Sequence, residues 1–194
     1  MNTSVSGIQS AISVYALVMA SFILVGAKLG QIWGAKKTFF IGAIIFGIGT
    51  GTAAISQSLG MLIIGWSIVE GIGSALMLPN TQVLARKKYE GKERVLAYAA
   101  IGAMMAIAAA AGPIIGGYLT TFHTWRYAFA FEVVVVLIMI AMSSLVVKDK
   151  LPKKVPTLDV TGAIVFAIGL SSIILSILVA PTYGLITAKQ PLEI

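Results

Sequence analysis

The sequence predicts an all-α integral membrane protein with about six transmembrane helices. Of its 194 residues, 58% are hydrophobic and only 11% are charged, whereas a soluble domain carries about 25% charged residues. The mean hydropathy of +0.97 agrees with this class. Six apolar segments each approach the roughly 20 residues that a helix needs to cross a bilayer. We predict spans at residues 8–33, 38–56, 61–85, 95–119, 127–147 and 158–180.

The residues before the first span give no sign of a cleaved leader. Residues 1–7 are polar and carry no charged side chain, and the apolar run that follows is too long for a signal peptide. The sequence contains no cysteine, so neither disulfides nor thiolate metal sites can form. Its one histidine, His123, cannot hold a metal ion alone. We therefore expect no metal and no cofactor.

The connectors between the spans alternate in charge. The first, third and fifth connectors hold eleven of the fourteen lysines and arginines. An excess of Lys and Arg in short loops marks the cytoplasmic side of a membrane. We therefore expect a multi-pass protein of the cell membrane with both termini of this chain outside. The net charge of +7 reflects this topology and contact with lipid phosphate. We expect no nucleic-acid partner, because loops this short cannot form a folded basic surface.

The second and third spans carry small residues at a spacing of four, at Gly47 and Gly51 and at Gly71 and Ala75. Such faces allow two membrane helices to approach closely. At the start of the sixth span, we expect Thr157 and Asp159 to supply a helix cap and a partner for the helix dipole.

The fourth span is built mainly from alanine and glycine. Its small residues also recur every four positions, at Ala108, Gly112 and Gly116, so we expect a neighbouring helix to pack against this face. Pro113 lies inside the same span, where we expect the helix to continue with a bend.

Ionisable residues inside a membrane are costly and are functional candidates by default. Glu70 lies near the middle of the third span, where it could carry a proton or attract a cationic substrate. The alternative is a glutamate hydrogen-bonded to neighbouring helices or facing an aqueous cavity. Glu132 lies about two turns below Arg126 in the fifth span and either lines a vestibule or pairs with a nearby polar group. Lys28 is close enough to a helix end to extend its ammonium group to the interface.

Three stretches of sequence, taken together, resemble the major facilitator superfamily, specifically its fourteen-helix drug:proton antiporter branch. Residues 26–37 are similar to the cytoplasmic loop motif between family helices two and three, and residues 69–79 to the helix-four motif. Residues 112–119, Gly-Pro-Ile-Ile-Gly-Gly-Tyr-Leu, resemble the helix-five motif of exporters. Residues 125–129 and 158–163 are similar to the starts of helices six and seven. The matching loop residues are Gly26, Gly30, Gln31, Gly34, Lys36 and Lys37, and those of the bend and packing motif are Gly112, Pro113, Gly116 and Gly117.

The resemblance implies that the six spans correspond to family helices two to seven. Residues 1–154 would form a partial N-terminal transporter bundle of five helices, and residues 155–194 an additional linker-type helix with an outer tail. Four positions depart from the family pattern. In the loop, Gln31 replaces the usual acidic residue and Ile32 replaces the basic residue that follows it. In helix four, Ser67 stands where the family usually has an arginine linked to proton coupling, and Glu70 replaces the usual glutamine.

The function implied by the resemblance is transport and not enzymatic catalysis. The chain would be a transporter fragment that exports hydrophobic or cationic small molecules, in the manner of multidrug efflux, in exchange for protons. Its partners would be the small-molecule substrate, protons, the lipid bilayer and the remaining half of the transporter. The alternative is a truncated, non-transporting membrane fragment or a subunit that depends on a partner chain.

Overall fold

The computed structural model of the protein describes residues 4–146, 157 and 159–183. Within these residues the chain is helical, and six helices are long and apolar enough to cross a membrane. The all-α, six-span prediction is therefore confirmed. The elements are α1 (Val5–Ile32), α2 (Ala35–Ala54), α3 (Leu59–Leu62), the π-helix η1 (Ile63–Glu70), α4 (Gly71–Lys88), α5 (Gly91–Phe122), α6 (Arg126–Ala141), the 3₁₀-helix η2 (Met142–Leu145) and α7 (Val160–Tyr183).

The third predicted span corresponds to one continuous helix made of α3, η1 and α4, from Leu59 to Lys88. It starts at Ser58, whose hydroxyl accepts a hydrogen bond from the Met61 backbone N–H at 3.2 Å. This bond satisfies one of the free donors at the helix start.

The helices extend further into the third connector than the sequence predicts. Residues 86–94 are expected to form a basic loop, yet only residues 89 and 90 separate α4 from α5. Three basic side chains occupy the last turn of α4, where they interact favourably with the negative end of the helix dipole. The fifth connector and the outer tail fall mostly at residues 147–156 and 184–194, outside the described residues.

The turn between α1 and α2 depends on Gly34, whose φ of 96° is strained for any residue with a Cβ atom. This requirement explains the glycine in the loop motif. Lys36, two residues later, donates a hydrogen bond from its Nζ to the Val146 carbonyl oxygen at 2.7 Å. The start of α2 is thereby joined to the end of η2.

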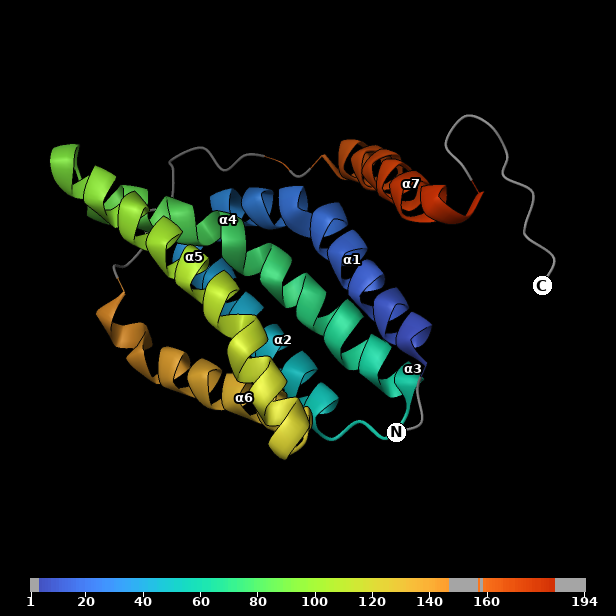
Figure 1. The fold of residues 1–194 in the computed structure, drawn as a ribbon. Coiled ribbons are helices and arrows are strands. Elements are labelled where there is room, and N and C mark those ends of the chain that lie inside the picture. Colours follow the sequence, from blue (N-terminus) through green and yellow to red (C-terminus); the bar gives the residue numbers. More distant parts are fainter. Residues whose placement is uncertain (1–3, 147–156, 158, 184–194) are drawn as a thin grey trace.

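Contacts between glycines and neighbouring backbone hold the centre of the bundle together. A Cβ atom on Gly73 of α4 would lie 2.5 Å from the Phe46 backbone nitrogen of α2, and one on Gly42 would lie 2.9 Å from the Gly73 carbonyl oxygen. On the other side of α4, a Cβ on Gly26 of α1 would overlap the Ala75 carbonyl oxygen. The small residues predicted in the third span therefore lie at helix contacts, which places α1 and α2 on either side of α4 (Figure 1).

Helix α6 packs on the face of α2 that carries the second pair of small residues. A Cβ on Gly47 would lie 3.0 Å from Val136 Cγ1, and one on Gly51 would lie 3.9 Å from Val133 Cγ2. The predicted packing role of this pair is confirmed. Helix α7 lies beside α1 (Figure 1), and the hydroxyl groups of Ser21 and Ser171 are 2.7 Å apart across that contact.

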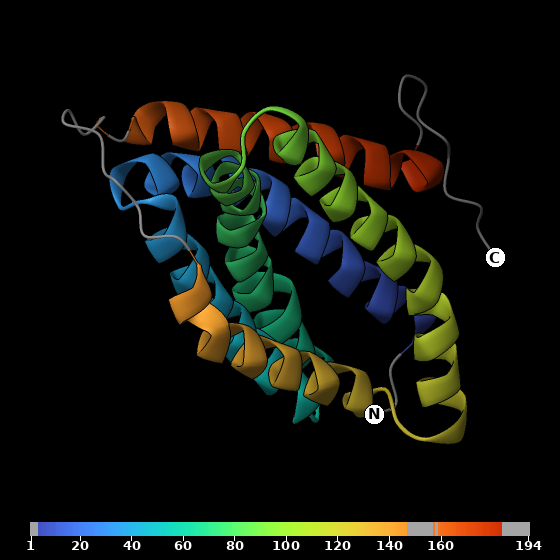
Figure 2. The same ribbon diagram turned by 90° about the vertical axis from the view of Figure 1, so that its left-hand side faces the viewer.

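Helix α5 leaves its small-residue face uncovered within the described part of the chain. It continues through Pro113 and changes direction along its length (Figure 2), as expected. However, none of its residues is buried, and a Cβ on Gly112, Gly116 or Gly117 would meet nothing within 4 Å. The close helix contact expected along Ala108, Gly112 and Gly116 is therefore not formed within the described part of the chain, because no described helix covers this face.

A buried asparagine joins α4 to α1. Asn80 is 1% exposed, and its Nδ2 donates hydrogen bonds to the Gly26 carbonyl oxygen at 3.0 Å and to the Leu76 carbonyl oxygen at 2.7 Å. A Cβ on Gly30 would overlap Asn80 Oδ1. Two glycines of the loop motif therefore make room for this connection.

The contact between α2 and α4 predicts different costs for two glycine substitutions. We expect Gly73→Ala to destabilise the fold by about 1–3 kcal/mol, since the added methyl group overlaps backbone that cannot move aside. Gly102→Ala is the matched control, because nothing lies within 4 Å of a Cβ there and the change improves helix propensity. Reversible unfolding in mixed micelles measures both. Equal unfolding midpoints for the two variants would contradict the close approach of α2 and α4.

The Asn80 connection predicts a cost for removing its amide. We expect Asn80→Ala to destabilise the fold by about 0.6–1.7 kcal/mol, the range measured for hydrogen bonds between membrane helices. Thr81→Ala is the control, because the Thr81 hydroxyl bonds to Met77 of its own helix. Unfolding measured in the same way checks this, and a control variant that is destabilised as much as Asn80→Ala would refute the role of the asparagine.

Candidate functional site

Glu70 is almost completely buried in the centre of the bundle. It is the last residue of the π-helix η1, its side chain is 2% exposed, and its Oε2 atom has no hydrogen-bond partner among the described residues. The backbone there presses against α2, because a Cβ on Gly49 would lie 2.5 Å from the Glu70 nitrogen. π-Helical turns inside α-helices occur frequently at functional sites. The structure thus holds a carboxyl group away from water at the end of the π-helical part of the third span.

Glu132 is held by a threonine of α2. The Thr50 hydroxyl donates a hydrogen bond to Glu132 Oε2 at 2.8 Å, and Thr50 itself is fully buried. Of the two interpretations of Glu132 that the sequence left open, pairing with a nearby polar group is the one observed. Thr50 is a site residue that the sequence analysis missed. Nothing in the sequence connects it with a residue 82 positions later.

The two predicted carboxyl groups meet at Thr50. The Glu70 carboxyl group neighbours the Thr50 hydroxyl, the Trp66 side chain and the Glu132 carboxyl group. The Tyr15 ring of α1 is close to both glutamates. Within the described residues, no lysine, arginine or histidine lies beside either carboxyl group. The site therefore contains two acidic groups that no basic side chain neutralises.

Aromatic rings form one wall next to the glutamates. The rings of Tyr15 and Trp66 stack with centroids 5.5 Å apart, and Phe129 of α6 meets Trp66 edge-on at 5.8 Å. The Tyr15 hydroxyl lies 2.7 Å from the Ser74 hydroxyl of α4. Four elements of the bundle, α1, η1, α4 and α6, therefore meet around this wall.

Ser67 occupies the position where the family resemblance places an arginine. It is fully buried, and its hydroxyl donates a hydrogen bond to the Ala11 carbonyl oxygen of α1 at 2.7 Å. This contact ties η1 to α1 one turn before Glu70. The residue therefore supplies no positive charge to the site, and its observed contact is between helices.

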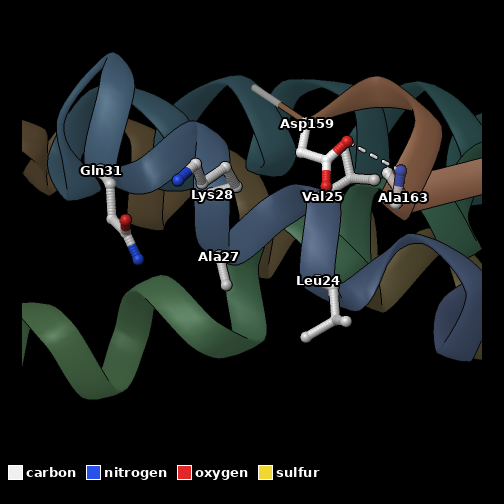
Figure 3. Close-up of a pocket in the computed structure, with 8 residues that line it drawn as sticks. Leu24, Val25, Ala27, Lys28, Gln31, Asp159 and Ala163 are labelled. Carbon is white, nitrogen blue, oxygen red and sulfur yellow. Dashed lines mark hydrogen bonds between the residues drawn. The ribbon is translucent and has the colours of Figure 1, made fainter. Parts of the chain in front are cut away.

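The loop motif lies apart from the glutamates, at the end of α1. A pocket of about 320 Å³ opens there between α1 and the start of α7, and Gln31, Lys28 and Asp159 contribute its polar lining (Figure 3). Figure 3 shows the Lys28 ammonium group directed away from the Asp159 carboxylate. Asp159 Oδ1 accepts a hydrogen bond from the Gly162 backbone N–H at 2.8 Å, so of the two residues predicted at this helix start, Asp159 caps the helix. Lys37, the last residue of the motif, is exposed.

The predicted outer residues, Arg126 and His123, and the glycines of the bend motif are not part of the site formed by Glu70 and Glu132. The Arg126 guanidinium group donates to the Ser56 carbonyl oxygen and lies 4.6 Å from the centre of the Trp125 ring. His123 is exposed between the rings of Tyr118 and Tyr127. The glycines of the bend motif face open space, as described for α5. The candidate site is therefore the pair Glu70 and Glu132 with Thr50 between them.

Comparison with known proteins gives matches along nearly the whole chain. Residues 1–188 match the Major Facilitator Superfamily. The chain is 29% identical over 185 residues to the uncharacterized MFS-type transporter EfpA of Mycobacterium tuberculosis, covering 95% of the chain and 34% of the relative. It is 24% identical over 185 residues to the tetracenomycin C resistance and export protein of Streptomyces glaucescens, with coverages of 95% and 34%. It is 31% identical over 176 residues to the probable actinorhodin transporter of Streptomyces coelicolor, with coverages of 88% and 30%.

Two of these relatives are named as transporters, and the third is named as a resistance and export protein. The chain spans about a third of the length of these curated relatives. The match over residues 1–188, together with six apolar helices, settles the family and the membrane class. The chain therefore belongs to the Major Facilitator Superfamily and is a multi-pass membrane protein of the transporter class.

Proposed function

We propose that this chain forms part of an exporter that releases hydrophobic or cationic small molecules from the cell in exchange for protons. The observation that carries the proposal is the buried carboxyl group of Glu70 beside the partly buried carboxyl group of Glu132, with no basic partner among the described side chains. The printed name of one relative, the tetracenomycin C resistance and export protein, supports the direction of transport.

The chemistry of the pair favours a role in binding a positive species. An ionised carboxylate inside the membrane is costly unless a cation or several hydrogen bonds compensate it. Glu70 Oε2 has no such partner in the described structure. A proton removes the charge, and a cationic substrate would compensate it. Binding and release of a proton at this pair would therefore change the electrostatic free energy of the bundle during a transport cycle.

The arrangement in the membrane is part of the same proposal. The connectors rich in Lys and Arg would lie in the cytoplasm, and both termini of the chain would lie outside the cell membrane. Transport would follow alternating access, in which two helical bundles move against each other around a central site. Residues 1–154 would contribute most of one bundle, and the helix α7 with its tail would be an additional linker element.

A second candidate function is favoured by the uncovered face of α5. No residue of this helix is buried, although it is 32 residues long and carries a stripe of small residues. A subunit that needs a partner chain, or a membrane fragment without transport activity, would leave such a face open. The efflux experiment separates this alternative from the exporter.

The proposal predicts that Glu70→Gln abolishes proton-driven efflux. The chain in its complete reading frame is expressed in cells that lack their main drug exporters, and the export of a lipophilic cationic dye is followed. Wild-type efflux is expected to stop when a protonophore collapses the proton gradient, because the proton supplies the driving force. The control is Glu93→Gln, which changes an exposed glutamate at the start of α5 and should leave efflux intact.

Three outcomes of this assay count against parts of the proposal. Efflux that persists with the protonophore removes the exchange with protons. Efflux that is unchanged in Glu70→Gln removes that residue from the coupling. Absence of efflux from the wild type for a panel of hydrophobic and cationic compounds favours the non-transporting or partner-dependent subunit.

A further inference from the structure

We propose that the Thr50 hydroxyl relays a proton between Glu70 and Glu132, so that the two carboxyl groups hold one proton between them. This inference deepens the proposed function, since it rests on the same pair of residues. It assigns a role to Thr50 and states that the pair holds one proton. Neither point follows from the presence of two glutamates alone. Three observations on the described residues carry it.

The first observation is the direction of the hydrogen bond at Thr50. Its Oγ1 donates to Glu132 Oε2 at 2.8 Å. A hydroxyl group has one proton to donate and two lone pairs that accept. Once its proton is directed at Glu132, Thr50 can interact favourably with the neighbouring Glu70 carboxyl group only as an acceptor. A hydrogen bond between Thr50 and Glu70 therefore forms only when Glu70 supplies the proton.

The second observation is the environment of Glu70. Its side chain is 2% exposed and its Oε2 has no hydrogen-bond partner. Leaving this oxygen buried without a hydrogen bond costs far less free energy when the carboxyl group is neutral than when it is ionised. Glu132 Oε2 accepts the Thr50 hydrogen bond, which is stronger when the acceptor is charged. We therefore assign the proton to Glu70, whose Oε2 is unpaired, and the negative charge to Glu132.

The third observation is the set of groups that face the pair. Tyr15 approaches from α1, Trp66 from η1, and Thr50 from α2. These neighbours carry no charge at neutral pH, and the described part of the chain places no basic side chain there. Two ionised carboxylates would repel each other in this setting. One proton shared by the pair relieves that repulsion and leaves a single negative charge.

The relay step balances in atoms and charge. The Glu70 O–H bond breaks and its proton binds Thr50 Oγ1, while the original Thr50 Oγ1–H bond breaks and that proton binds Glu132 Oε2. Glu70 becomes ionised and Glu132 becomes neutral, and the total charge of the pair is unchanged. The negative charge thereby moves from α6 to the end of η1, so the step changes which helix carries it.

Infrared spectroscopy of the 194-residue chain in lipid nanodiscs tests the relay, because a protonated carboxyl group has its own C=O stretching band. At neutral pH we expect one such buried carboxyl group per chain in the wild type. Glu70→Gln should lose the band, because the glutamine amide donates to Thr50 as a neutral Glu70 does and leaves Glu132 ionised. Glu132→Gln should keep the band, because Glu70 remains the protonated group.

Substitutions in α2 show whether Thr50 takes part. Thr50→Val should shift the band to the higher frequency of a carboxyl group whose O–H has no acceptor. Thr50→Ser keeps the hydroxyl and should retain the wild-type band. Thr52→Val is the matched control, because the Thr52 hydroxyl bonds to Ile48 of its own helix at 2.8 Å, and it should leave the band unchanged.

Several results would overturn the inference. An unchanged band in Thr50→Val removes the relay, and a wild type with two protonated buried carboxyl groups, or with none, removes the shared proton. A band that survives in Glu70→Gln assigns the proton to another group. None of these measurements involves transport. The relay can therefore be refuted by the spectra without affecting the efflux result, and the exporter can be refuted by the efflux assay without affecting the spectra.

Discussion

Because lipid tails are as apolar as leucine, helices inside a membrane gain little from hydrophobic burial and associate through close packing. In this bundle the glycines at positions 42, 49 and 73 supply that packing, since a Cβ at any of them would lie within 3.0 Å of backbone of the opposing helix. This contact sets the position of η1 against α2. The positions of Glu70 and Thr50 relative to each other follow from it.

The electrostatics of the site are a consequence of that packing. Helix η1 packs against one face of α2, and α6 packs against the other face. Together these contacts place two carboxyl groups around one hydroxyl group. The aromatic rings on α1, η1 and α6 complete an environment without described basic groups. Such an environment favours a neutral or singly charged pair. Proton binding, rather than a permanent ion pair, is therefore the chemistry that we propose for the protein.

Much of the fold could be predicted from the sequence, because hydropathy and the distribution of Lys and Arg report directly on membrane spans. The packing role of the small residues is seen where a described helix covers them, as at Gly47, and stays a prediction for α5, where none does. Glu70 could be chosen as a candidate site residue from its depth in the third span alone. Its meeting with Glu132 through Thr50 could not be predicted, because it depends on how α6 packs on α2, and no local pattern encodes that contact.

The contact between α2 and α6 is the central claim, and a disulfide tests it most directly. The sequence has no cysteine, so Gly47→Cys combined with Val136→Cys gives a signal free of background. A Cβ on Gly47 would lie 3.8 Å from the Val136 Cβ, within the range of about 3.5–4.5 Å typical of disulfides. We predict rapid cross-linking on oxidation in membranes, and none when Ile138, which is 55% exposed, replaces Val136 as the second cysteine position. No cross-link for the first pair, or an equal yield for both, would contradict the account.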